Sequence, residues 1–237
     1  MVHLSVLTII FLRSSLILHE CFILPIICSA EVNLLSAITD SPRDFNVRKV
    51  FEIGRNGGYL FDWDVKSLKA EEKLLQEVIV NIESNKEFVI YASIKILSSR
   101  TGALFSISHS QRKLLLLDLF TKGIGNKTKL ILRYRSTDDK AEDVVFKGLG
   151  ALGDRRYHTI VLRISDVMTE NGKKISSVTL YLDCKQFGKV ETVSPISSIF
   201  SYRGTLLSRL EFRLGQRGFG SKIHTQWRVS TLFNVLT

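Results

Sequence analysis

The stretch RRYHTIVLRISDVMTENGKKISSVTLYLDC, residues 155–184, decides the fold. It is rich in β-branched and aromatic residues, and Asn171-Gly172 stands between two apolar runs. Asn-Gly flanked by such runs is a strong signal for a tight turn between two strands. From Val178 to Cys184 apolar and polar residues alternate, as a half-buried strand requires. The stretch therefore predicts two antiparallel strands.

Three glycines precede this stretch at the spacing G-x-G-x-x-G: Gly148, Gly150 and Gly153. In dinucleotide-binding proteins a helix follows such glycines, and its N-terminal amides hold the phosphates. Here a strand pattern follows instead. The sequence thus favours a loop between two strands over a nucleotide site.

Short alternating segments fill most of the remaining chain. They are EFVIYASIKIL (87–97), GALFSISH (102–109), RKLLLLDLF (112–120), TKLILRYRS (128–136) and RLEFRLGQ (209–216), after a first strand VRKVFEIG (47–54). One segment, residues 64–82, instead has helical spacing, with Leu68, Leu75, Val78, Ile79 and Ile82 on one side. The pattern predicts an all-β, antiparallel sandwich with one short amphipathic helix.

Residues 1–30 are almost wholly apolar and end in Cys28-Ser29-Ala30. This pattern predicts a secretory signal peptide cleaved after Ala30. An uncleaved membrane anchor is the alternative. Cleavage would leave Cys184 as the only cysteine of the mature chain.

The formal net charge is +10, and the excess of Lys and Arg lies from residue 86 onward. A basic field of this kind favours a polyanion, and the abundant extracellular polyanions are sulfated glycosaminoglycans. A solvated surface that only keeps the protein soluble is the alternative.

Five segments resemble a known family in their order and spacing. They are FVIYASIKILSSRTGALFSI, YHTIVLRI, VTLYLDCKQ, SPISSIF and RLEFRLGQRG. Together they resemble the thrombospondin N-terminal-like domain, a laminin-G-like β-sandwich (jelly roll), and FRLGQRG is especially similar to the NEL-like secreted glycoproteins. The resemblance implies a secreted, non-enzymatic module of a larger adhesive or signalling glycoprotein of the extracellular matrix. Such a module binds heparin or heparan sulfate and matrix or cell-surface receptor proteins, and needs no cofactor.

The apolar start and the resemblance together divide the chain into four parts. They are a signal peptide (1–30), a leader and first strand region (31–50), the laminin-G-like domain (51–220) and a degenerate or truncated closing segment (221–237). The family's closing strand and its second cysteine are not recognisable. Either the chain is a fragment of a longer protein, or a degenerate strand such as QWRVSTLF (226–233) closes the sheet.

Basic residues are the candidate heparin contacts. The resemblance places Arg100 and Arg55 in regions where the family is basic, and Arg112-Lys113 and Arg155-Arg156 are adjacent cations that can meet sulfates together. An isolated surface charge is the alternative for each of them. The single N-x-S/T site, Asn126, predicts N-glycosylation in an exposed turn.

Cys184 matches the family's disulfide position, yet cleavage after Ala30 would remove its possible partners. The sequence therefore predicts a reactive thiol and Cys184-linked dimers. A buried, unreactive core thiol is the alternative.

Enzyme chemistry finds little support. The five histidines are scattered without metal-binding spacing, and Cys184 falls on an apolar strand face, where a thiolate is disfavoured. Asp138-Asp139 and Glu142-Asp143 could bind calcium, but a mobile charged hairpin tip is favoured. We expect no enzyme, no metal and no nucleic-acid partner. The alternative function is a structural or oligomerising head without a glycosaminoglycan site.

Overall fold

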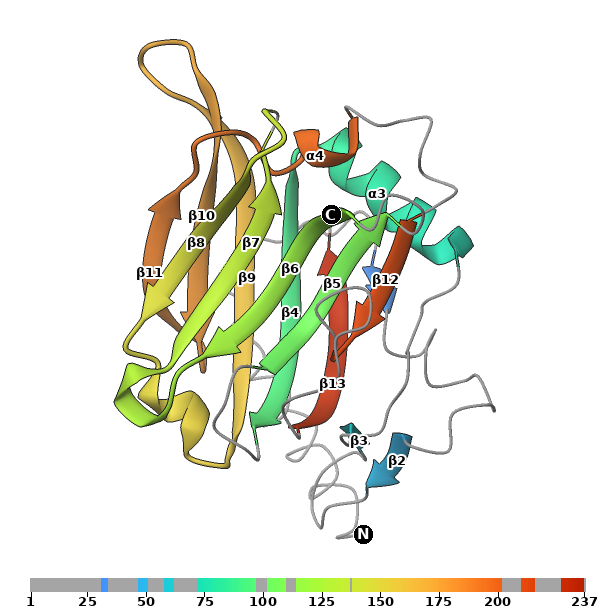
Figure 1. Cartoon of the computed structure of the whole chain (residues 1–237), viewed down its shortest axis with the longest axis vertical. Coiled ribbons are helices and arrows are strands. Elements are labelled where there is room, and N and C mark those ends of the chain that lie inside the picture. The colour runs from blue at the N-terminus through green and yellow to red at the C-terminus, as the bar shows by residue number, and fades with distance from the viewer. Residues whose placement is uncertain are drawn as a thin grey trace, which may run out of the picture.

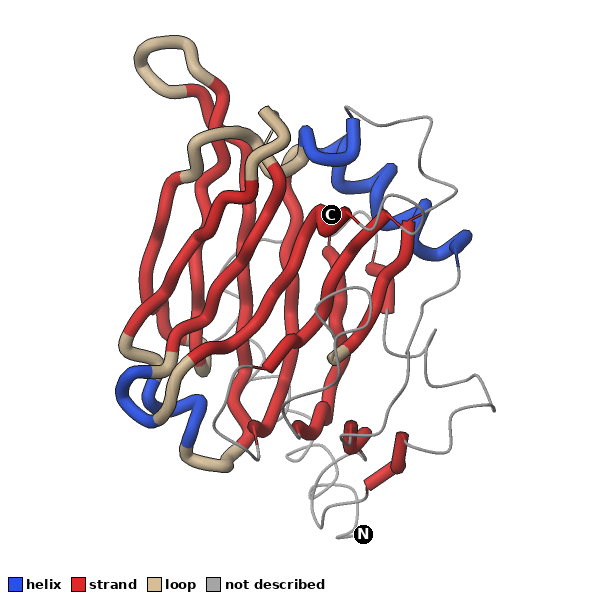
Figure 2. The backbone as a smooth tube through the Cα atoms, in the orientation of Figure 1, coloured by secondary structure: helices blue, strands red, loops and turns tan. Residues whose placement is uncertain are grey.

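The protein folds as two antiparallel β-sheets packed face to face (Figures 1 and 2). The computed structural model describes residues 31–33, 47–50, 58–61, 72–96, 102–109, 114–136, 138–201, 210–215 and 227–236. The expected all-β sandwich with one short amphipathic helix is confirmed.

The larger sheet has eight strands. They are β1 (Glu31–Asn33), β2 (Val47–Val50), β3 (Gly58–Phe61), β4 (Glu87–Ile96), β9 (Tyr157–Met168), β10 (Lys174–Leu182), β11 (Lys185–Glu191) and β13 (Trp227–Leu236). Their order is β11-β10-β9-β4-β13-β3-β2, and β1 pairs with β13. The segment 226–233, weighed above as a closing strand, thus falls largely within β13, which covers the edge of β4.

The smaller sheet has five strands, in the order β12-β5-β6-β7-β8. They are β5 (Gly102–His109), β6 (Leu114–Lys122), β7 (Lys129–Arg135), β8 (Ala141–Lys147) and β12 (Leu210–Leu214). Two short 3-10 helices, η1 (Gly125–Lys127) and η2 (Gly150–Gly153), lie together at one end of the sandwich. Helices α3 (Glu72–Asn85) and α4 (Ser198–Ser201) lie near the other end.

The core forms where the alternating apolar residues of the two sheets meet. On β4 the alternate residues of the apolar pattern are all buried: Phe88, Ile90, Ala92, Ile94 and Ile96. Helix α3 adds Leu75, Val78, Ile79 and Ile82 to the same core, as its spacing predicts. Leu68, the remaining member of the predicted apolar side, lies outside the described residues.

The Asn171-Gly172 hairpin is confirmed. Gly172 has a φ of 71°, which favours glycine, and its N–H donates to the Thr169 carbonyl at 2.9 Å. The three spaced glycines lead through η2 into β9, a strand. The helix that a phosphate-binding loop requires is not at this place in the chain.

Cys184 lies in the exposed two-residue turn between β10 and β11, so its predicted position on an apolar strand face is wrong. Strand β10 ends at Leu182, which pairs with Lys185. Asp183 and Cys184 both have positive φ, 50° and 67°, as a type I′ hairpin turn requires.

Cys184 is disulfide-bonded, which also overturns the expected free thiol and its alternative, a reduced core cysteine. The chain's other two cysteines, Cys21 and Cys28, lie outside the described residues.

Replacing Cys184 by serine should destabilise the protein by about 2–4 kcal/mol, the usual contribution of one disulfide. Reductant should lower the melting temperature of the wild type and leave Cys184→Ser unchanged. Thermal melts of both proteins with and without reductant measure this, and peptide mapping without reduction identifies the partner. A wild-type melt that is insensitive to reductant would contradict the prediction.

Residues 138–143 form a turn and the start of a strand, where a mobile tip was expected. Asp138 and Asp139 lie in the turn, whereas Glu142 and Asp143 belong to β8. The Asp143 carboxylate accepts two hydrogen bonds from Arg133, at 2.6 and 2.7 Å. No group of three or more His, Cys, Asp or Glu in the described part of the chain is arranged to hold a metal ion.

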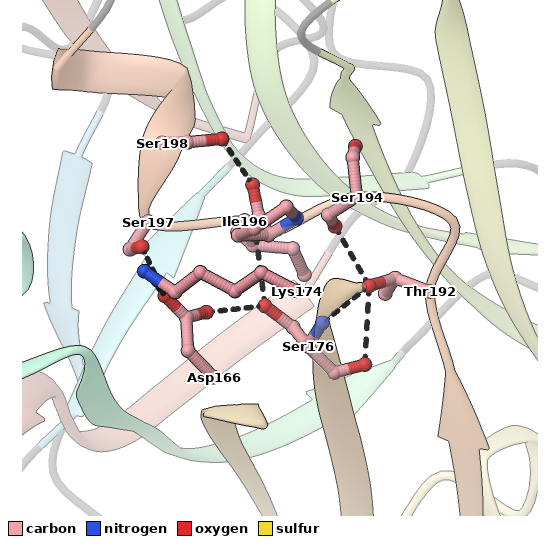
Figure 3. Close-up of polar contacts among 9 residues, drawn as sticks. Asp166, Lys174, Ser176, Thr192, Ser194, Ile196, Ser197 and Ser198 are labelled. Carbon is pink, nitrogen blue, oxygen red and sulfur yellow. Dashed lines mark hydrogen bonds and ion pairs between the residues drawn. The ribbon is translucent and has the colours of Figure 1, made fainter. Parts of the chain in front are cut away.

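A buried polar cluster anchors the segment between β11 and α4 (Figure 3). At its centre the Asp166 side chain is 2% exposed. It accepts hydrogen bonds from Ser176 Oγ at 2.6 Å and from Ser197 Oγ, and Lys174 Nζ lies 3.4 Å away. We call these four residues the Asp166 cluster.

Further hydrogen bonds tie residues 192–198 to the cluster. Ser176 Oγ accepts the Ile196 N–H at 2.8 Å, and the Ser176 N–H donates to Thr192 Oγ1 at 2.7 Å. The segment therefore cannot leave β10 without exposing several buried polar groups, each of which costs free energy when it loses its partner.

Candidate functional site

Three lysines form a row across the smaller sheet. Lys122 at the end of β6 pairs with Lys129 at the start of β7, and Lys129 pairs with Lys147 at the end of β8. Neighbouring antiparallel strands lie about 4.8 Å apart, so the three side chains emerge close together on one face. Lys127, in η1, lies beside the same row.

The lysines surround a pocket of about 610 Å³, which we call the lysine pocket. Its lining residues are Lys122, Gly123, Asn126, Lys127, Lys129, Ile131, Val145, Lys147 and Gly148. Ile131 and Val145 come two positions along their strands from Lys129 and Lys147, so they share the same face of the sheet. The pocket thus combines an apolar part with four cations, and no carboxylate of the described residues lines it.

The charges of the lysine pocket are uncompensated. None of its four ammonium groups forms an ion pair within the described part of the chain. Like charges on directly opposite residues of neighbouring strands destabilise a sheet. An anion bound among these lysines would remove that repulsion, so the arrangement suits a negatively charged ligand.

Arg133, on the same face, differs from the lysines because its charge is already paired. Its hydrogen bonds to Asp143 raise the pKa of the guanidinium, and its Cζ lies 5.5 Å from the centre of the Phe120 ring. Phe120 packs with Ala103 and Ile131 in a small apolar cluster. Along this face of the smaller sheet the paired Arg133 comes first, the apolar residues follow, and the unpaired lysine row comes last.

A rigid turn positions Lys127. Gly123 has a φ of 111°, and a Cβ there would come within 2.4 Å of the Lys127 carbonyl oxygen, so only glycine fits. The Leu149 N–H donates to the Thr128 carbonyl at 3.0 Å, which joins η1 to the segment before η2. These contacts hold the wall of the lysine pocket in place.

The residues predicted from sequence lie elsewhere. Arg55, Arg100, Arg112 and Lys113 are outside the described residues. Arg155 and Arg156 are exposed after η2 and do not line the pocket. Among the predicted site residues that the structure describes, Asn126 is the one that lines the lysine pocket.

The pocket lysines do not stand out in the sequence, because no two of them are adjacent. Their signal is different: Lys122 and Lys147 end strand patterns, and Lys129 begins one. Because consecutive strands run antiparallel, the end of one strand and the start of the next lie at the same end of the sheet.

A second polar group, also missed from sequence, centres on buried His158. Its Nδ1 lies 2.7 Å from Asp183 Oδ2, and its Nε2 lies 2.9 Å from Asp154 Oδ1. Burial alone would lower the pKa of His158, but the hydrogen bonds and charges of the two carboxylates raise it above 6.5. At Asp154 burial alone would raise the pKa of the carboxyl, but hydrogen bonds and charges from His158 and Arg156 lower it.

The His158 contacts should make the protein more stable at about pH 6 than at about pH 8. Because the folded-state pKa of His158 is raised, its contribution is complete below the unfolded value of 6.5 and is lost as the pH rises through the folded value. The contribution of Asp154 is lost only in acid, below its unfolded value of 3.8. Urea denaturation at both pH values measures the difference. His158→Gln should reduce it, and an equal difference in that variant would contradict the assignment.

Comparison with known proteins gives partial similarity to the NEL proteins. The chain is 24% identical over 132 residues to the protein kinase C-binding protein NELL2 of Xenopus tropicalis, which covers 56% of this chain and 14% of that protein. It is 25% identical over 160 residues to protein NEL of Gallus gallus, covering 67% of this chain and 18% of that protein. The chain thus matches 14% to 18% of the length of these relatives. No protein-family model matches it.

Among solved structures, one that the chain is similar to is the receptor-binding domain of botulinum neurotoxin type G. It is 12% identical, with a TM-score of 0.48, and the match covers 81% of this chain and 41% of that one. Another is the Ruminococcus gnavus IT-sialidase CBM40 bound to α2,3 sialyllactose, which is 15% identical with a TM-score of 0.39, covering 65% and 80% of the two chains. Among the described residues, no helix has the length and apolar character needed to cross a membrane.

Proposed function

We propose that this chain is a secreted, extracellular binding module whose lysine pocket binds sulfated glycosaminoglycans such as heparin. The proposal rests on the row of Lys122, Lys129 and Lys147 beside a pocket that no carboxylate in the described part of the chain lines. Similarity to the NEL proteins supports the extracellular location.

The chemistry of the pocket fits a sulfated sugar. Lysine ammonium groups are compact, strongly hydrated charges that meet sulfate oxygens without a fixed geometry. Val145, which is only partly buried, offers apolar surface to the C–H face of a sugar ring. Ligand pockets commonly combine apolar surface with a few polar groups that fix orientation. A chain of alternating sugar and sulfate presents both kinds of surface.

A protein partner is the second candidate, and strand β11 favours it. β11 pairs with β10, and within the described strands nothing pairs with its other edge. Phe187 on β11 is 42% exposed. An open edge can add a strand from another chain. In this alternative the chain is a structural or oligomerising head, and the basic surface is incidental.

Heparin chromatography separates the two candidates. The chain made in a bacterial periplasm, where disulfides form and no N-glycan is added, should bind heparin resin at physiological salt and elute as salt rises. Free heparin should compete for the protein, whereas chemically desulfated heparin should not. Passage through the resin without retention would contradict the glycosaminoglycan assignment.

A further inference from the structure

We propose that an N-linked glycan on Asn126 occludes the lysine pocket, so that glycan occupancy decides whether the pocket takes an anionic ligand. The inference rests on the proposed function only for the identity of the ligand. Asn126 is the first residue of Asn126-Lys127-Thr128, the single N-x-S/T site of the chain, and it also lines the pocket.

Asn126 can carry a sugar without disturbing the fold. It is exposed in η1, and its amide makes no hydrogen bond to the described residues. Attachment therefore breaks no contact there. In the reaction Asn126 Nδ2 displaces the lipid pyrophosphate of an activated oligosaccharide at the first sugar's C1, and the nitrogen loses one proton.

The position of Asn126 directs the sugar over the pocket. A Cβ on Gly150 would come within 2.5 Å of Asn126 Oδ1, so the amide oxygen lies against the η2 backbone. Asn126 lines the lysine pocket together with the four lysines, so the first sugar is attached at the wall of the pocket. A pocket of about 610 Å³ is of the size that a small ligand fills. The core sugars of an N-glycan carry no charge, so they exclude an anion without replacing it.

The test uses the full chain secreted from glycosylating cells. Wild type is compared with Asn126→Gln and Thr128→Ala, two independent ways to remove the acceptor site. The control moves the glycan: Asn126→Gln with Lys173→Thr turns Asn171-Gly172-Lys173 into an acceptor site. That turn lies at the opposite end of β9, about 35 Å from η2 by strand rise (Figure 1). Asn126→Gln with Lys173→Ala matches the control in charge.

The wild-type glycoform should bind heparin at least about tenfold more weakly than Asn126→Gln and Thr128→Ala, a loss comparable to one charged contact. The protein with the moved glycan should bind as tightly as its charge-matched partner. Equal binding by the wild-type glycoform and Asn126→Gln would overturn the proposal, as would a secreted wild type without a glycan on Asn126.

Lysine acylation followed by mass spectrometry tests occlusion without heparin. Lys122, Lys129 and Lys147 should react more slowly in the wild-type glycoform than in Asn126→Gln, whereas exposed Lys185 should react equally in both. Equal rates at the pocket lysines would overturn occlusion. The pocket lysines could be shielded while the unglycosylated variants fail to bind heparin. That result would support occlusion and would reject heparin as the ligand.

Discussion

Replacing Lys122, Lys129 and Lys147 together by glutamine should lower the affinity of the unglycosylated chain for heparin by about a hundredfold or more. Each lysine that meets a sulfate contributes a charged contact whose loss costs about tenfold in affinity. The slope of log affinity against log salt should also fall by about two to three, by analogy with phosphate contacts. Isothermal titration at several salt concentrations measures both quantities.

A matched variant separates the pocket from net charge. Arg155→Gln, Arg156→Gln and Lys185→Gln together also remove three exposed cations, none of which lines the pocket. This triple variant should lose much less affinity than the lysine triple. Equal losses would mean that binding follows the overall charge. The lysine triple should keep the melting temperature of the wild type, because the substitutions remove repulsion and leave the core unchanged.

Replacing Asp166 by alanine should destabilise the protein by about 3 kcal/mol. The substitution leaves the Ser176 and Ser197 hydroxyls without their acceptor, and each buried donor that loses its partner costs about 1–3 kcal/mol. In a chain of 237 residues this loss lowers the melting temperature by about 6–12 °C. Urea denaturation measures the change.

Lys174→Met is the control for Asp166→Ala. Its ammonium lies 3.4 Å from the same carboxylate but is 43% exposed, so the substitution should cost less than about 1 kcal/mol. A similar loss in both variants would show that the ion pair, and not the buried hydroxyls, dominates the cluster.

The strand patterns and the Asn171-Gly172 turn could be predicted because they depend on neighbours in the chain. On β4 and α3 the spacing of apolar residues alone identifies the buried side. Strand β8 could not be predicted because its buried face is short, with only Val144 and Phe146 in the core. Strand β11 could not be predicted because exposed residues dominate it and none of its side chains is fully buried. Cys184 was misplaced because the alternation continues past Leu182, where two residues of positive φ end the strand.

The lysine pocket could not be predicted, because it depends on register. Lys122 and Lys147 meet only through the pairing of three strands, which the Gly123 turn and the loops between strands determine. The His158 group depends in the same way on Asp183, which a hairpin turn brings to it from 25 residues away. In both places the residues of the group are distant in the sequence, and the residues next to them in the chain form no recognisable motif.

The place of β13 constrains how the chain can fold during synthesis. This late strand lies between β4 and β3, where Leu236 pairs with Val89 and also with Glu31. Contacts between residues so far apart in sequence form slowly, because a long loop must close before they contribute. While the ribosome is still making residues 227–236, β4 has one unpaired edge and β1 has no partner strand. Until then the nascent protein exposes a strand edge on which other chains can aggregate, which is where a chaperone would protect it.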